Sequence, residues 1–110
     1  AKEPSINKKD MRKLRSDIIT RRSKELKPLE ERAQKLENLI SEKEELLEKK
    51  NSEMIEAAGV KTGKEIEALS KEIHTLQREI ESLFDEYEKL HNGLDEKKNF
   101  FESELKKLEE

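Results

Sequence analysis

The sequence predicts an all-α protein: an antiparallel two-helix coiled-coil hairpin with a preceding basic N-terminal helix. Charged residues make up 46% of the 110-residue chain and hydrophobic ones only 31%, a balance typical of long exposed helices rather than of a globular core. Leucine and isoleucine recur at alternating spacings of three and four, the heptad pattern of coiled coils. A short glycine-containing segment separates two such patterns, so the second helix is expected to fold back along the first.

The charge of the chain is unevenly distributed. Residues 1–27 hold ten basic and four acidic side chains, a net charge of +6. Residues 28–110 hold 14 basic and 23 acidic side chains, a net charge of −9. We therefore expect two domains, a basic N-terminal arm over residues 1–27 and an acidic hairpin over residues 28–110.

The basic arm carries its own helix signals. Asn7 and Asp10 have the spacing of a helix N-cap and the third helical residue. A short apolar stripe follows, formed by Met11, Leu14 and Ile18. Pro28 interrupts this pattern, and because proline inside a helix removes a backbone hydrogen bond, we expect a bend near residues 24–28.

The first helix of the hairpin is expected over residues 28–58. Its apolar seam consists of Leu29, Ala33, Leu36, Ile40, Leu47 and Met54. Lys43 and Lys50 also fall at seam positions, where a lysine packs its alkyl stem and keeps its ammonium group in solvent. Packing should be loose at these two positions.

A turn is expected at residues 59–62, where the heptad pattern breaks. Gly59 suits the left-handed position just after a helix. Thr62 and Glu65 have the spacing of a capping box, which predicts a second helix over residues 63–109. Its seam is more regular and runs through Ile66, Leu69, Ile73, Leu76, Ile80, Leu83, Tyr87, Leu90 and Leu94, then through Phe101, Leu105 and Leu108.

Folding back about the turn places Met54 near Ile66 and Ala33 near Tyr87. A hairpin of this kind buries its own seam, so we expect a monomer. Two parallel chains would satisfy the same heptads, and this alternative stays open.

Enzymatic activity is not expected of this chain. A narrow helical seam lacks the concave apolar walls of a substrate pocket, and the absence of cysteine removes thiolate chemistry. His74 and His91 lie 17 residues apart with no second imidazole one turn away, so we interpret both as surface residues and expect no metal site. No apolar run approaches the roughly 20 residues of a membrane span, so no membrane partner is expected.

Two stretches of this chain match the pattern of a known family. The first is a basic lead-in to a heptad helix, Arg21-Arg22-Ser23-Lys24-Glu25-Leu26-Lys27-Pro28-Leu29. The second is the block Leu83-Phe84-Asp85-Glu86-Tyr87-Glu88-Lys89-Leu90 on the return helix. Over about residues 8–92 the chain resembles the C-terminal coiled-coil domain of ABC-F ATPases, which are ATP-binding cassette proteins without membrane domains. Tyr87 stands where the family commonly has tryptophan, and about twenty residues follow Leu90 where many members end.

The resemblance implies a cytoplasmic parent protein that acts on the ribosome, where rRNA and tRNA are the nucleic-acid partners, or that binds branched DNA through its coiled coil. ATP and Mg²⁺ would then belong to domains upstream of Ala1, since this chain has no Gly-x-x-x-x-Gly-Lys loop. No cofactor is expected in the chain itself. Because the chain begins at Ala1 without a methionine, we expect it to be a piece of a larger protein.

Nucleic-acid contact is the function that the charge pattern favours. The candidate contact residues in the arm are Lys8, Lys9, Arg12, Lys13, Arg15, Arg21, Arg22, Lys24 and Lys27. A second, smaller group lies at the turn, where Lys61 and Lys64 belong to a segment of net charge +2 over residues 49–64. Cationic side chains bind phosphates of DNA and RNA alike, without reading sequence. The alternative is a purely structural or protein-interaction coiled coil that spaces parts of a larger assembly.

Overall fold

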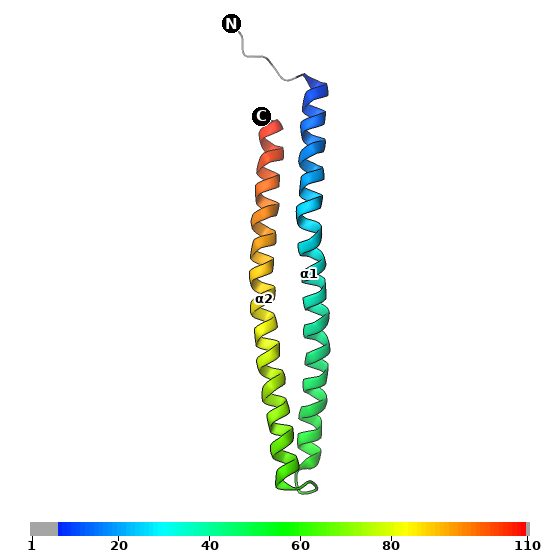
Figure 1. Cartoon of the computed structure of the whole chain (residues 1–110), viewed down its shortest axis with the longest axis vertical. Helices are drawn as coiled ribbons and strands as arrows, with labels where there is room; N and C mark the ends of the chain where they lie inside the picture. The colour runs from blue at the N-terminus through cyan, green and yellow to red at the C-terminus, as the bar shows by residue number, and fades with distance from the viewer. Residues whose placement is uncertain (1–6, 110) are drawn as a thin grey trace. The chain divides into compact units, whose positions relative to one another are not determined.

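The computed structural model describes residues 7–109, which form two α-helices. Helix α1 spans Lys8–Ala57 and helix α2 spans Gly63–Glu109 (Figure 1). No strand occurs between residues 7 and 109. The predicted all-α helical hairpin is confirmed, and the bounds of α2 coincide with those predicted for the second helix.

The basic arm is helical, as predicted, but it is the first part of α1 and not a separate helix. Helix α1 continues through Pro28 without interruption. Proline costs the helix one hydrogen bond and crowds the preceding turn, whereas packing of buried side chains supplies most of the stability of a protein helix. Leu26 before the proline and Leu36 after it are 4% and 1% exposed. Burial on both sides of Pro28 therefore keeps the backbone helical.

The ends of both helices carry the predicted caps. The backbone N–H of Asp10 donates to Asn7 Oδ1 at 2.8 Å. At the start of α2, the N–H of Glu65 donates to Thr62 Oγ1 at 3.3 Å, and the N–H of Thr62 donates to Glu65 Oε2 at 3.2 Å. These reciprocal bonds satisfy backbone donors that have no partner inside the helix.

The turn between the helices depends on one left-handed residue. Gly59 has a φ angle of +83°, which a side chain disfavours and glycine adopts freely. The next two backbone N–H groups, those of Val60 and Lys61, both donate to the Ala57 carbonyl at 3.0 Å. Helix α1 thus ends at Ala57, one residue before the predicted end.

The packing divides the chain into two compact units. The hairpin unit comprises residues 33–89 and contains the turn. The described residues of the terminal unit are 7–32 and 90–109. The division of the chain into domains at residue 27 stays a prediction.

The hairpin unit is held by a buried apolar seam and by polar pairs that join its helices. Its buried side chains are Leu36, Ile40, Ala57, Leu69, Ile73 and Leu76. Lys43 Nζ lies 2.5 Å from Glu79 Oε2, and Lys50 Nζ lies 3.0 Å from Glu72 Oε2. Lys50 lies seven residues after Lys43 on α1, whereas Glu72 lies seven residues before Glu79 on α2. The two segments are therefore antiparallel. The two seam lysines thus pair with partly exposed glutamates across the seam.

The terminal unit is built in the same way from the first part of α1 and the last part of α2. Leu26, Leu94 and Phe101 are its buried side chains among the residues described. Lys97 Nζ donates to Glu25 Oε1 at 3.3 Å, and the Arg21 guanidinium lies 5.6 Å from the centre of the Phe101 ring. Arg21 lies four residues before Glu25 on α1, whereas Phe101 lies four residues after Lys97 on α2. These two segments are therefore also antiparallel.

Candidate nucleic-acid interface

The predicted contact residues fall into two separate places in the fold. The nine cationic residues of the arm, from Lys8 to Lys27, all lie on α1 within the terminal unit. Lys61 and Lys64 lie at the turn of the hairpin unit. The structure brings the arm residues onto one helix and keeps the turn lysines in a different compact unit.

Four lysines form the most accessible part of the arm, and we call them the outer lysines: Lys9, Lys13, Lys24 and Lys27. All four are exposed. At 100° per residue they lie within about 60° of one another around the helix axis, and at 1.5 Å per residue the row is about 27 Å long. None of the four forms an ion pair with any residue between 7 and 109. Four ammonium groups that form no ion pair in the described range therefore lie on one side of α1.

The arginines of the arm are more engaged with the protein. Arg21 lies over the ring of Phe101 and pairs with Glu25 at 3.8 Å, an arrangement in which the ring face attracts the cation. Arg22 is half-buried, and its Nε atom is buried without a hydrogen-bond partner in the described part of the chain. Arg12 and Arg15 are exposed. Arg21 and Arg22 thus contribute to packing, which leaves the lysines, Arg12 and Arg15 as the freest cations.

The segment that packs against the arm does not neutralise it. Residues 7–32 hold ten basic and five acidic side chains, a net charge of +5, whereas residues 90–109 hold four basic and five acidic ones, a net charge of −1. The described part of the terminal unit therefore has a net charge of +4. Residues 33–89, the hairpin unit, hold nine basic and 15 acidic side chains, a net charge of −6. The division of charge follows the division into compact units.

Phe101 was predicted to lie on the seam of the second helix, and its burial confirms this prediction. It is 1% exposed and is one of the two largest fully buried side chains. Its ring and that of Phe100 pack in a T-shaped arrangement with ring centres 5.2 Å apart, and the Arg21 guanidinium lies over the Phe101 ring. The sequence did not predict its contact with Arg21, because that contact depends on the register between the first part of α1 and the last part of α2.

The turn offers fewer free cations than its sequence suggested. Lys61 and Lys64 are exposed, as is Lys49. Lys50, by contrast, bonds to Glu72 and lies 3.8 Å from Glu53. The hydrogen bond to Glu72 and the charge of Glu53 raise the pKa of Lys50 above its usual value. Lys50 is therefore committed to the packing of the hairpin unit.

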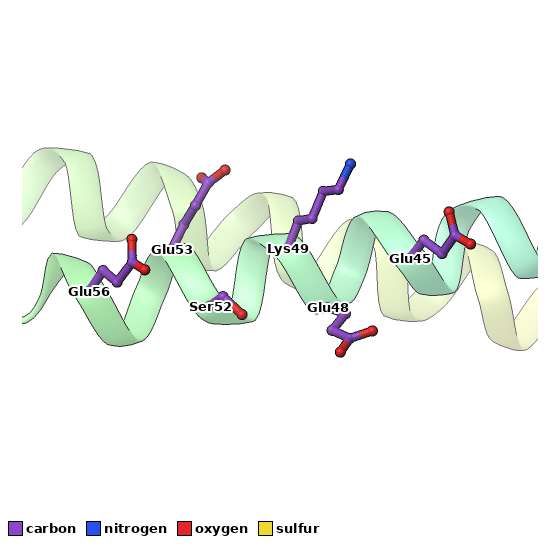
Figure 2. A pocket seen from close by; sticks show the side chains of 6 residues that line it. All are labelled: Glu45, Glu48, Lys49, Ser52, Glu53 and Glu56. Atoms are coloured by element: carbon purple, nitrogen blue, oxygen red, sulfur yellow. The ribbon is translucent and has the colours of Figure 1, made fainter.

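The carboxylates of the acidic surface near the turn do not all point to one side of α1 (Figure 2). A shallow depression along α1 is lined by Lys49, Ser52 and four glutamates, Glu45, Glu48, Glu53 and Glu56. Figure 2 shows the Glu48 carboxylate pointing away from the side on which the Glu45, Glu53 and Glu56 carboxylates lie. Within residues 7–109, no group of three or more histidine, cysteine, aspartate or glutamate side chains is placed to hold a metal ion.

The histidines are also dispersed. His74 is exposed, and the Nε2 atom of His91 lies 3.6 Å from Asp95 Oδ2, one helical turn away. In the portion of the chain that the structure describes, no helix is long and apolar enough to cross a membrane.

Comparisons of the chain with protein-family models, with curated proteins and with solved structures find no match. Its function is therefore inferred from its own residues.

Proposed function

We propose that this chain is a non-catalytic nucleic-acid-binding appendage that contacts the phosphate backbone through the basic face of α1. In line with its resemblance to ABC-F ATPases, its parent would be a cytoplasmic ATP-binding protein of that type, with ATP and Mg²⁺ bound by domains upstream. The nucleic acid would be rRNA or tRNA on the ribosome, or branched DNA. The chain would act as a monomeric hairpin.

The observation that supports this proposal is the row of outer lysines. These ammonium groups are exposed, lie on one side of α1 and have no acidic partner among residues 7–109. Their row of about 27 Å matches the length of roughly eight base pairs at 3.4 Å each. Each phosphate that such a row neutralises releases counterions into solution, which favours binding most strongly at low salt.

The charge of the two compact units also predicts where a nucleic acid would bind. The described part of the terminal unit carries +4 and attracts a polyanion, whereas the hairpin unit carries −6 and repels it. The lysines at the turn, Lys61 and Lys64, lie within the acidic unit. They are expected to contribute less than the arm.

Salt-dependent binding of the full chain tests the proposal. Fluorescence anisotropy with a four-way DNA junction and with a structured RNA hairpin gives the affinity at several salt concentrations. Replacing the four outer lysines by glutamine removes up to four phosphate contacts. The log–log slope of affinity against salt on DNA should then become less negative by about 3 to 4, at about 0.9 per contact. Glutamine is a good helix former, so the helical content should be unchanged.

A matched variant removes the same charge from the hairpin unit, with Lys35, Lys49, Lys61 and Lys64 all replaced by glutamine. All four are exposed, and their loss should change the slope by less than about 1. A larger effect from this variant than from the outer-lysine variant would place the contact surface at the turn. If neither nucleic acid binds in a salt-sensitive way, the chain is a structural or protein-interaction spacer instead.

A further inference from the structure

The two sides of the seam in the hairpin unit have different chemistry. On one side, Lys43 and Lys50 bridge the helices by pairing with Glu79 and Glu72. Because successive helix residues lie 100° apart, Glu44 and Glu48 project on the other side of the seam. Neither of these two carboxylates forms an ion pair with any residue in the described range.

This second side forms an acidic groove along α1, which consists of two adjoining hollows that share Glu44. Its carboxylates are Glu37, Glu44 and Glu48, and neither hollow is lined by a lysine or an arginine. The α1 residues that line it recur at spacings of three and four from residue 37 to residue 55, over about 27 Å or five helical turns. The groove is long enough for a helix of about 18 residues.

Apolar side chains line the same groove. Ile80 of α2 lies in one hollow and Phe84 in the other. Phe84 is 48% exposed and Ile55 is 78% exposed, so large apolar groups meet solvent at both ends of the groove. Exposed apolar surface with a charged rim is typical of a surface that contacts another protein.

We propose that the acidic groove binds a basic amphipathic helix of another protein. The apolar face of such a helix would cover Phe84, Ile80 and Ile55. Its flanking lysines or arginines would pair with Glu44 and Glu48, which form no ion pair with any residue between 7 and 109. Recognition of a helix in a groove uses apolar anchors at spacings of three, four and seven, the same spacing as the residues that line the groove.

The arm of this chain and a nucleic acid fit the groove less well. Leu26 of the arm is 4% exposed, and the two exposed large apolar residues of the arm, Leu14 and Ile19, lie about 140° apart around the helix axis, so they form no single apolar face for the groove. A nucleic acid would be repelled by the net charge of −6 over residues 33–89. The complementary ligand is therefore a cationic helix that presents its own apolar face. This proposal goes beyond nucleic-acid binding and does not depend on it.

The test uses the full chain and a fluorescent peptide of about 18 residues, with leucine at spacings of three and four and lysine elsewhere. Binding is followed by anisotropy. Phe84→Ala should weaken binding about tenfold or more, because aromatic anchors dominate such interfaces. Phe100→Ala is the matched control, since Phe100 is 49% exposed but lies in the terminal unit, and it should change the affinity less than twofold. Circular dichroism verifies that both variants keep their helical content.

Two further comparisons separate groove recognition from general attraction of charge. Glu44→Gln with Glu48→Gln should weaken binding more than Glu42→Gln with Glu81→Gln, which removes the same charge from exposed positions that line neither hollow. A peptide of the same composition with leucine and lysine scrambled should bind at least tenfold more weakly. The outer-lysine variant should bind the peptide unchanged, which keeps this result independent of nucleic-acid binding.

Three outcomes would overturn the proposal. Equal binding of the scrambled peptide would show that only charge is recognised. Equal losses from Phe84→Ala and Phe100→Ala would show that the groove is not the contact surface. A dimer in sedimentation that Phe84→Ala dissociates would show that the groove is occupied by a second copy of the chain.

Discussion

Replacing Phe101 by alanine should be the most destabilising single truncation in the terminal unit. The side chain is 1% exposed, its ring centre lies 5.2 Å from that of Phe100, and its face carries the Arg21 guanidinium at 5.6 Å. Full burial of a phenylalanine side chain stabilises a protein by up to about 3 kcal/mol, and the cavity left behind adds to the cost of truncation. We expect a loss of about 3 kcal/mol, near the lower end for phenylalanine, because a cavity between only two helices collapses easily.

Urea denaturation of the full chain, monitored by circular dichroism, measures the loss in free energy of unfolding. Hydrogen exchange shows which residues lose protection. Exchange should become faster at residues 94–105 in the Phe101→Ala variant and stay unchanged at residues 66–80, because these segments belong to different compact units. Phe100→Ala, at 49% exposure, should cost less than about 1 kcal/mol. Equal losses from the two alanine variants would refute the reasoning, because they would mean that Phe101 is not the buried anchor of this unit.

Three further changes test the hairpin unit. Tyr87 is the single tyrosine of the chain, and its hydroxyl donates to Glu37 at 2.7 Å; this bond and burial raise the pKa of Tyr87 above 10.0. Ultraviolet absorbance of the phenolate should show a lower midpoint in Glu37→Gln, and the stability that the bond contributes should be present below pH 10 and lost as the pH rises through the folded-state pKa. Gly59→Ala should destabilise the chain by about 1 kcal/mol in urea denaturation, because no atom lies within 4 Å of the new methyl group and the positive φ alone opposes it. Cysteines at Met54 and Ile66 should crosslink within one chain on a denaturing gel, and crosslinks only between chains would contradict the hairpin.

The sequence by itself determined the helix caps, the turn and the second helix, because these features depend on residues close together in the chain. The caps at Asn7 and Thr62 bond to groups three residues away, and Gly59 sets the turn through its own φ angle. Heptad spacing likewise identified most of the buried residues, since it is the geometry of one helix that places them on one face. The same geometry, at 100° per residue, places the outer lysines on one side of α1.

The tertiary structure decided which side chains of the two helices meet. The sequence placed Lys43 and Lys50 at the seam, but only the antiparallel register brings Glu79 and Glu72 opposite them. The antiparallel register also places the Phe101 ring beneath Arg21. Arg21 was predicted to contact phosphate, and this packing makes it less free to do so than the exposed lysines of the arm. Pro28 stays inside α1 because leucines on both sides of it are buried. The residues next to a proline in the sequence do not reveal the stability that this packing adds.

The acidic groove has the same origin. The heptad pattern predicts that every glutamate outside the seam is exposed. Because the chain has 23 glutamates, the sequence does not indicate which of them lie in a groove. Glu44 can form an ion pair across the seam only if a lysine or arginine of α2 lies beside it. The α2 residues that line the two hollows are Ile80, Phe84 and Tyr87. The difference between the two sides of the seam is a property of the pair of helices. It exists only once packing has set their register and rotation.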